Sequence, residues 1–168
     1  MCRIIFIGDV HNKGTSIIEN YARFKKKNGE IGTRFALLLE VGYDGNPEEN
    51  SNSAITVVAS SKPQNGDRAF LIELANKASV CYGFDSDDHS IYSLARQNQQ
   101  YKNIKKLAKE IIDRDKMDVL IIVGAAHLEL NSEHSSWKPH HEKLDGALGK
   151  SVYCYSMFED GSKLDYDD

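Results

Sequence analysis

Apolar residues gather along the chain in short unbroken runs, and longer stretches of different periodicity separate these runs. Five runs rich in β-branched and aromatic residues predict strands, at 3–8, 35–41, 80–84, 118–123 and 151–157. A run without polar alternation is typical of a strand covered on both faces, as in parallel sheets joined by helices. The pattern therefore predicts an α/β fold with a mainly parallel central sheet and helices on both faces.

Helical periodicity is clearest between residues 89 and 116. There Ile104, Leu107, Ala108, Ile111 and Ile112 repeat at the spacing of one buried helix face. Shorter helices are predicted from a cap at Thr15 or Ser16 to Asn28-Gly29, from Gly66-Asp67 to Lys77, and around 142–148. The turn-rich stretch 42–52 predicts a loop, and the short run 54–59 fits strand and helix equally.

The length and composition fit one folded domain. The chain has 168 residues, of which 40% are hydrophobic and 27% charged, and most single domains fall near this size. We expect one α/β domain over residues 1–160. The remaining residues, 161–168, read as an acidic C-terminal tail that is frayed over Asp165–Asp168.

Charge and hydropathy exclude several partners. With 21 basic and 25 acidic side chains, the net charge of −4 offers no general attraction to nucleic acid. The longest apolar runs are far shorter than the roughly 20 residues of a membrane-spanning helix.

The N-terminus lacks the pattern of a secretory signal, which predicts a cytoplasmic location, although signal-independent export would leave no trace. A small-molecule or peptide substrate is the expected partner, and the oligomeric state stays open, with a homo-oligomer as one alternative.

The three cysteines, Cys2, Cys81 and Cys154, show no C-x-x-C spacing, and each lies in or beside an apolar run. They are read as reduced, buried thiols. The sequence also contains no nucleophile elbow, no phosphate-binding loop and no dinucleotide-binding glycine motif.

Four of the five predicted strands are followed at once by a histidine or a carboxylate. The first leads into Gly8-Asp9-Val10-His11, the second ends in Glu40, the third is followed by Asp85, and the fourth leads into Gly124-Ala125-Ala126-His127. In open parallel sheets, ligands bind beyond the carboxyl ends of the strands, so these side chains are expected at one edge. Two of the four carry the same G-x-x-H pattern.

Two histidines and a carboxylate can bind a metal ion or carry out acid/base chemistry. The alternative is structural: each histidine caps a helix or bonds a loop carbonyl group. For Glu40, which follows an apolar run, the structural alternative is an ion pair with Arg34, Arg3 or Lys13.

The order of these motifs resembles the superfamily that contains erythromycin esterases, ChaN-like haem-uptake proteins, TraB and the Tiki proteases. The resemblance covers residues 3–127 and rests on the two G-x-x-H motifs, the Leu-Glu that ends the second strand and the aspartate after the third. It implies that His11 and His127 are the paired histidines, that Glu40 is the active-site glutamate and that Asp85 takes the acidic position after the third strand.

The resemblance implies three kinds of chemistry. Tiki-type members are associated with metal-dependent peptide hydrolysis, which would place a divalent ion such as Mn, Co or Zn on His11, Glu40 and His127. In the erythromycin esterases a histidine activates water without a metal ion, and ChaN-like members are associated with haem. The chain departs from the pattern by carrying Asp9 where esterase-like members often have Glu, and it is shorter than usual members, so no substrate class carries over.

Three other candidate sites have weaker support from the sequence than His11, Glu40 and His127. The GDVH motif resembles the first motif of metallophosphoesterases, but the further motifs of that family do not occur. A calcium loop starting at Asp85 fails because its sixth position is Ser90 and its twelfth is Arg96. The second histidine-rich stretch, His134, His140 and His141, is read as a solvated loop and helix start.

The sequence thus predicts a hydrolase of ester or peptide bonds. His11 or His127 would activate water, directly or as a metal ligand, and Glu40 would act as ligand, orienting group or proton acceptor. The first alternative is a haem- or metal-binding module without catalysis. The second is a degenerate copy that keeps the sheet as an interaction surface.

Overall fold

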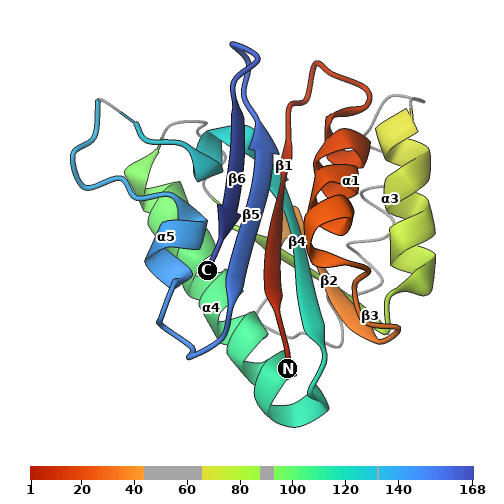
Figure 1. Ribbon diagram of the computed structural model, residues 1–168. Helices are drawn as coiled ribbons and strands as arrows, with labels where there is room; N and C mark the ends of the chain where they lie inside the picture. The colour runs from red at the N-terminus through yellow and green to blue at the C-terminus, as the bar shows by residue number, and fades with distance from the viewer. Residues whose placement is uncertain (44–65, 88–92, 132) are drawn as a thin grey trace.

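The computed structural model describes residues 1–43, 66–87, 93–131 and 133–168. These residues contain a six-stranded sheet in the order β3-β2-β4-β1-β5-β6 (Figure 1). The first five strands are parallel, and β6 runs antiparallel to β5. The strands are β1 (Ile4–Asp9), β2 (Phe35–Gly42), β3 (Val80–Asp85), β4 (Asp118–Gly124), β5 (Val152–Met157) and β6 (Lys163–Asp167). The predicted α/β class and mainly parallel sheet are confirmed.

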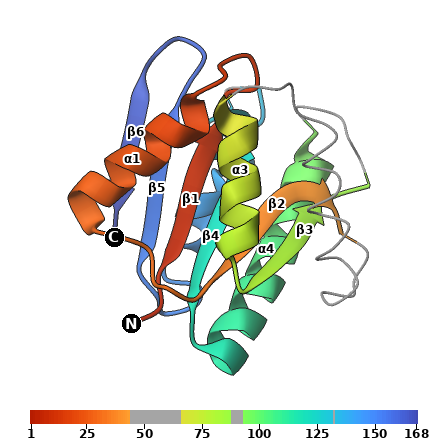
Figure 2. The same ribbon diagram turned by 90° about the vertical axis from the view of Figure 1, so that its right-hand side faces the viewer.

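Helices cover both faces of the sheet (Figures 1 and 2). On one face lie α1 (Ser16–Asn28) and α3 (Gly66–Lys77), and on the other lie α4 (Leu94–Asp115) and the short α5 (His140–Leu144). A single 3-10 turn, η1 (Ala125–Leu128), follows β4 directly. The segment 54–59, most of the predicted loop 42–52 and the start of the predicted helix 89–116 lie outside the described residues. In the part of the chain that is described, no helix is long and apolar enough to cross a membrane.

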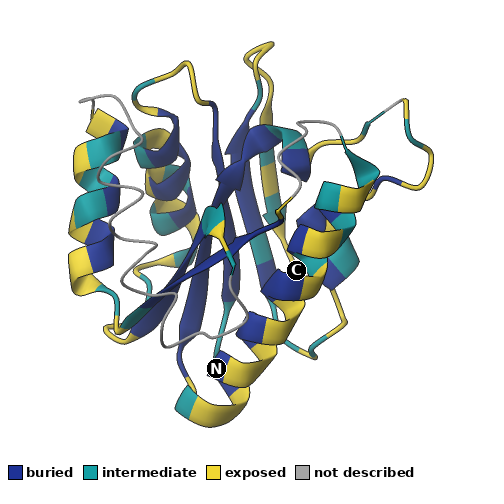
Figure 3. Ribbon diagram, turned by 180° about the vertical axis from the view of Figure 1, so that it is seen from behind, coloured by how far each residue is buried: buried dark blue, intermediate teal, exposed yellow. Residues whose placement is uncertain are grey.

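The unbroken apolar runs are explained by two hydrophobic clusters, one on each face of the sheet. In β1, Ile4 and Phe6 belong to the cluster under α4, whereas Ile5 and Ile7 belong to the cluster under α1 and α3. All six residues of β1 are buried (Figure 3). Because successive side chains point to opposite faces, a strand covered on both sides is apolar at consecutive positions, as β1 is from Ile4 to Ile7.

The C-terminal residues form a strand, so the expectation of a frayed tail over Asp165–Asp168 is wrong. Strand β6 pairs with β5 from Met157↔Lys163 to Tyr153↔Asp167. Leu164 and Tyr166 pack against the cluster under α4, while the charged residues between them face solvent. The strand is an edge strand with one apolar face, and its three exposed charges conceal this face in the sequence. The last short helix also differs: it starts at His140, ahead of the predicted 142–148.

A side chain from a different helix caps the N-terminus of α1. Thr15 makes no capping hydrogen bond through its side chain. Instead, Ile17 and Ile18 donate their backbone N–H groups to the buried carboxylate of Asp67, at 3.2 and 3.1 Å. The hydroxyl of Ser16 accepts a hydrogen bond from the N–H of Val10 at 3.0 Å. These bonds fix the loop between β1 and α1, which carries His11.

The topology opens a crevice between the carboxyl ends of β1 and β4. These strands are neighbours in register from Ile4↔Val119 to Asp9↔Gly124. After β1 the chain crosses to the face of α1, and after β4 it crosses through η1 to the face of α5. Connections that leave neighbouring strands towards opposite faces leave room for a ligand at that point.

The cysteines are unpaired and two of them lie in the sheet. Cys81 and Cys154 are buried, and Cys2 is half-buried. Burial raises the pKa of both buried thiols, that of Cys81 to about 12. Neither thiol is therefore ionised at neutral pH, and neither is suited to act as a nucleophile.

Gly8 provides a test of the packing between β1 and β5. A Cβ atom at this position would overlap the side chain of Ser156, whose Cβ would be only 2.7 Å away. Gly8→Ala is expected to lower the free energy of unfolding by about 1–3 kcal/mol in urea denaturation, because both strands are buried and cannot separate. Gly42→Ala at the end of β2 is the matched control, since a Cβ there meets no described atom within 4 Å. Equal effects of the two substitutions would contradict this packing.

Candidate functional site

The structure brings His11, Glu40 and His127 together at the carboxyl ends of β1, β2 and β4. They surround Gly124, the last residue of β4. A Cβ atom built on Gly124 would lie 3.2 Å from Glu40 Oε2, 3.5 Å from His11 Nε2 and 3.6 Å from His127 Cδ2. Glycine at this position therefore leaves space into which three chemically active groups converge.

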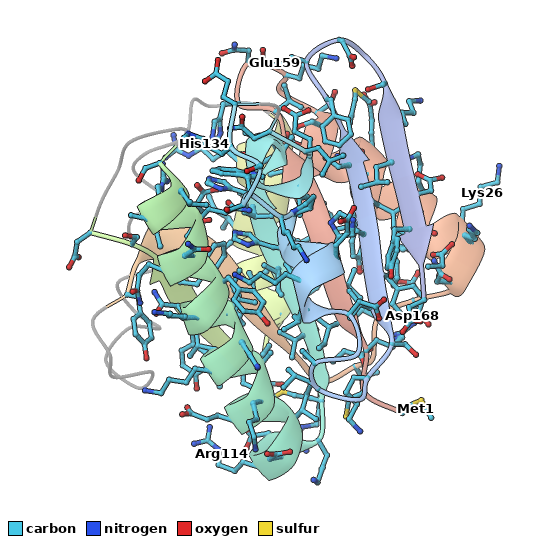
Figure 4. All side chains as sticks on the ribbon, turned by 90° about the vertical axis from the view of Figure 1, so that its left-hand side faces the viewer. Met1, Lys26, Arg114, His134, Glu159 and Asp168 are labelled. Carbon is cyan, nitrogen blue, oxygen red and sulfur yellow. The ribbon has the colours of Figure 1, made fainter. Side chains whose placement is uncertain are left out.

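A cavity of about 470 Å³ opens over these residues. Its walls come from the loop after β1, the end of β2, η1, the start of α4 and the turn between β5 and β6. Figure 4 shows Glu159, from that turn, at the opposite end of the molecule from Met1. The lining consists of Asp9, Val10, His11, Asn12, Glu40, Arg96, Gly124, Ala125, Ala126, His127, Glu129, Phe158, Glu159 and Asp160.

An irregularity in β2 accompanies Glu40. Leu39 pairs with Gly83 and Gly42 pairs with Asp85, so β2 contains one residue more than β3 between these two pairs. An extra residue of this kind bends the strand and redirects a side chain, and such bulges are common next to active sites. Glu40 therefore leaves the regular sheet where the cavity begins.

Four nitrogen atoms surround the Glu40 carboxylate. Arg96 Nη2 lies 2.8 Å, His127 Nε2 3.2 Å and Gln100 Nε2 3.3 Å from Oε1. The backbone N–H of Gly124 donates to Oε2 at 2.6 Å. Burial alone would raise the pKa of Glu40, but the hydrogen bond and charge of His127, the Gly124 N–H and the charge of Arg96 outweigh burial and lower the pKa to about 2. Glu40 is therefore an ionised carboxylate at neutral pH.

Arg96 joins Glu40 to Asp85. Its Nε and Nη2 atoms lie 3.0 and 2.9 Å from the two carboxylate oxygens of Asp85, and Gln100 donates to Asp85 Oδ1 at 2.7 Å. Asp85 is buried behind Arg96 and is absent from the cavity lining. The ion-pair partner of Glu40 is Arg96 rather than the Arg34, Arg3 or Lys13 considered from the sequence. Asp85 therefore orients the arginine and does not itself face the cavity.

Three residues of α4 that contact the site were not predicted from the sequence: Arg96, Gln97 and Gln100. Gln97 and Gln100 are buried, and they continue towards the N-terminus the same helix stripe that Ile104 and Leu107 begin. Polar residues at the buried positions of an amphipathic helix must find partners, because an unpaired buried amide is costly. The spacing of Gln97 and Gln100 along the buried face of α4 is the sequence signal that indicates their burial.

His127 is held on several sides. Its Nδ1 lies 2.5 Å from Gln97 Oε1, and its Nε2 faces Glu40. The ring is nearly parallel to those of Trp137 and His140, with centroids 5.9 and 5.6 Å away. Only 3% of the residue is exposed. The imidazole therefore has a fixed orientation.

His11 forms a pair with Asp9. Its Nδ1 lies 3.0 Å from Asp9 Oδ2, and the hydroxyl of Ser16 donates to Asp9 Oδ1 at 3.4 Å. The Asp9 side chain is 5% exposed and that of His11 is 70% exposed. A buried carboxylate bound to Nδ1 leaves Nε2 as the nitrogen over Gly124. His11 is therefore an oriented imidazole that water can reach.

The expectation of a solvated loop at His140 and His141 is wrong, although a helix does begin at His140. Both residues are buried, and burial lowers the pKa of both imidazoles, that of His141 to about 4. His140 Nε2 lies 2.9 Å from Gln100 Oε1, and His141 packs edge-on against Tyr166. The hydrogen bond of His140 and the ring contact of His141 accompany this burial. His134 is half-buried in the preceding turn and is outside the cavity lining.

Acid stability tests the charged state of Glu40. A carboxyl group whose pKa falls on folding stabilises the protein above its unfolded pKa, and this stabilisation is lost as pH falls through the folded pKa. The free energy of unfolding is expected to decrease by about 3 kcal/mol more in the wild type than in Glu40→Gln between pH 4.5 and pH 2. Urea denaturation of both proteins at each pH, with EDTA present, measures this difference in the free energy of unfolding. Glu110→Gln, an exposed position on α4, is the control, and identical pH profiles for wild type and Glu40→Gln would refute the assignment.

Comparison of the chain with protein-family models, with curated proteins and with solved structures finds no match. The fold and the geometry around Gly124 are therefore the observations on which a functional assignment rests.

Proposed function

We propose that the protein hydrolyses ester or peptide bonds and that His11 removes the proton from the attacking water. The observation that carries the proposal is the convergence of two differently held imidazoles on the space above Gly124. The Asp9-oriented His11 is exposed to water, whereas His127 is buried against Glu40. An imidazole held by a buried carboxylate is the usual arrangement of a general base.

The second imidazole supplies the acid. A protonated His127 is stabilised by the ionised Glu40, and Arg96 adds a second positive charge at the same wall of the cavity. Water attacks the carbonyl carbon while its proton passes to His11 Nε2, and negative charge develops on the carbonyl oxygen near these cations. The carbon–oxygen or carbon–nitrogen bond then breaks, and the leaving group takes the proton of His127 Nε2. Exchange with solvent restores both rings.

The residues do not fit a divalent metal ion well. Arg96 and the Gly124 N–H already bind the two oxygens of Glu40, and His127 Nε2 lies 3.2 Å from one of these oxygens, in direct contact with the carboxylate. Among the described residues, no three histidine, cysteine or acidic side chains are arranged to hold a metal ion. The proposed steps therefore run through protein side chains and water.

The charge of the cavity does not favour the other ligands considered. Five carboxylates and one guanidinium line it, which gives a formal charge of −4 with neutral histidines. Haem propionates and phosphate esters are anionic, and they would be repelled by this lining. We therefore place the protein closest to the esterase-like branch of the superfamily that its motifs resemble, ahead of haem carriage or a metallophosphoesterase-like activity.

Removal of either histidine tests the proposal. His11→Ala and His127→Ala are each expected to lower kcat/KM at least about 100-fold, because each removes a proton-transfer group. Both variants are assayed with an internally quenched fluorogenic peptide, whose amine leaving group must be protonated, and His11→Ala is also assayed with p-nitrophenyl acetate, whose leaving group departs without a proton. His134→Ala removes a histidine outside the cavity lining and should keep wild-type turnover. Unchanged turnover in the folded double variant, His11→Ala with His127→Ala, would overturn the proposal.

Chelation distinguishes the water-activating histidine from a metal-activated water. Dialysis against EDTA is expected to leave the hydrolysis rate within about twofold of the untreated enzyme, since a base held by Asp9 needs no metal ion. Loss of activity that Mn²⁺, Co²⁺ or Zn²⁺ restores would contradict the metal-free mechanism and would favour the metal-dependent alternative.

A further inference from the structure

Two glutamines of α4 each pair with one buried histidine. Gln97 contacts His127, and Gln100 contacts His140, three positions along the same helix face. Both glutamines are almost fully buried. An amide side chain has one accepting and one donating end, so its surroundings determine which end meets the ring.

The orientation of the Gln97 amide is fixed by two backbone carbonyl groups. Its Nε2 donates to the carbonyl oxygen of Lys138 at 2.9 Å and to that of His127 at 3.2 Å. The reverse orientation would place the amide oxygen against two acceptors in a buried position. The accepting end, Oε1, must therefore face His127 Nδ1, which acts as the donor in that hydrogen bond.

This hydrogen bond decides which nitrogen of His127 is available to the site. With Nδ1 bound as N–H to Gln97, the exchangeable proton of the ring is the one on Nε2, beside Glu40. Without Gln97, a neutral ring would place its proton on Nε2 and donate it to the Glu40 carboxylate. Nδ1 would then be the unprotonated nitrogen, buried and away from the cavity.

We propose that Gln97 is a positioning residue that holds His127 with Nδ1 protonated and so reserves Nε2 for proton transfer. The part of this inference that concerns turnover rests on the proposed hydrolase function, whereas the protonated nitrogen of His127 can be observed without a substrate.

The Gln100–His140 pair is an internal comparison with the opposite result. Gln100 Nε2 donates to Asp85 at 2.7 Å and lies 3.3 Å from Glu40, so its Oε1 accepts from His140 Nε2. His140 therefore carries its proton on Nε2, and its Nδ1 has no hydrogen-bond partner among the described residues. The two neighbouring rings are thus fixed with different nitrogens as donors.

The test is nitrogen NMR of protein labelled with ¹⁵N-histidine, with long-range correlations to the ring protons. The wild type should show a protonated Nδ1 in His127 and a protonated Nε2 in His140. Gln97→Met keeps the length of the side chain and removes the amide acceptor, so His127 should change to an unprotonated Nδ1 while His140 stays unchanged.

Gln99→Met is the matched control, because Gln99 lies two positions away on the exposed face of α4. Gln97→Met is further expected to lower kcat for the internally quenched fluorogenic peptide about 10- to 100-fold, because the amine leaving group of a peptide needs the proton of His127, whereas Gln99→Met should leave kcat unchanged. An unprotonated Nδ1 of His127 in the wild type, or an unchanged Nδ1 in folded Gln97→Met, would overturn the inference. The wild-type spectrum tests the inference even if Gln97→Met does not fold.

The hydrolase proposal and the proposed role of Gln97 can be refuted independently. If the wild type hydrolyses neither probe but shows the expected ring nitrogens, the positioning by Gln97 stands and the hydrolase proposal falls. If the wild type is active and Gln97→Met changes neither the ring nitrogens nor kcat, the positioning role falls and the hydrolase proposal stands.

Discussion

Glu40 carries an ionised carboxylate at the end of a strand whose first five residues are all buried. It remains charged there because nitrogens from β4, η1 and α4 meet its two oxygens. Removing an ion from water is costly unless opposite charges and hydrogen bonds replace the solvent. The same contacts join the end of β2 to α4 and to the β4–η1 segment, both of which are distant from β2 in the sequence. The carboxyl edge of the sheet is therefore assembled around this one carboxylate.

The environment of Glu40 also separates the two histidines into different chemical roles. Both end a G-x-x-H motif after a parallel strand, so the sequence makes them equivalent. The fold places His11 in solvent beside a buried aspartate, and it places His127 in the interior beside Glu40 and a glutamine. An exposed imidazole with a carboxylate on Nδ1 is suited to accept a proton, and a buried imidazole against an ionised carboxylate is suited to hold one. The asymmetry is what gives the site a direction for proton transfer.

The sheet and the convergence of His11, Glu40 and His127 could be predicted because parallel strands deliver their carboxyl ends to one edge. Contacts between elements that are distant in the sequence could not be predicted in this way. The capping of α1 by Asp67 requires that α3 begin beside it, and the burial of His140 and His141 requires the ring contacts of α5. Arg96, Gln97 and Gln100 were missed because polar residues on a helix are usually solvated, and only their place in the buried stripe shows otherwise. Strand β6 was missed because alternating charges conceal its single apolar face.

The proposed chemistry requires that His11 and His127 act on one reacting carbon above Gly124. The most direct measurement is a crystal structure with a trifluoromethyl ketone, whose neutral hydrate resembles the tetrahedral intermediate. We predict that one hydrate oxygen lies about 3 Å from His11 Nε2 and the other within hydrogen-bonding distance of His127 Nε2 or Arg96. A hydrate bound in the cavity with neither imidazole in contact, or bound outside it, would contradict the claim.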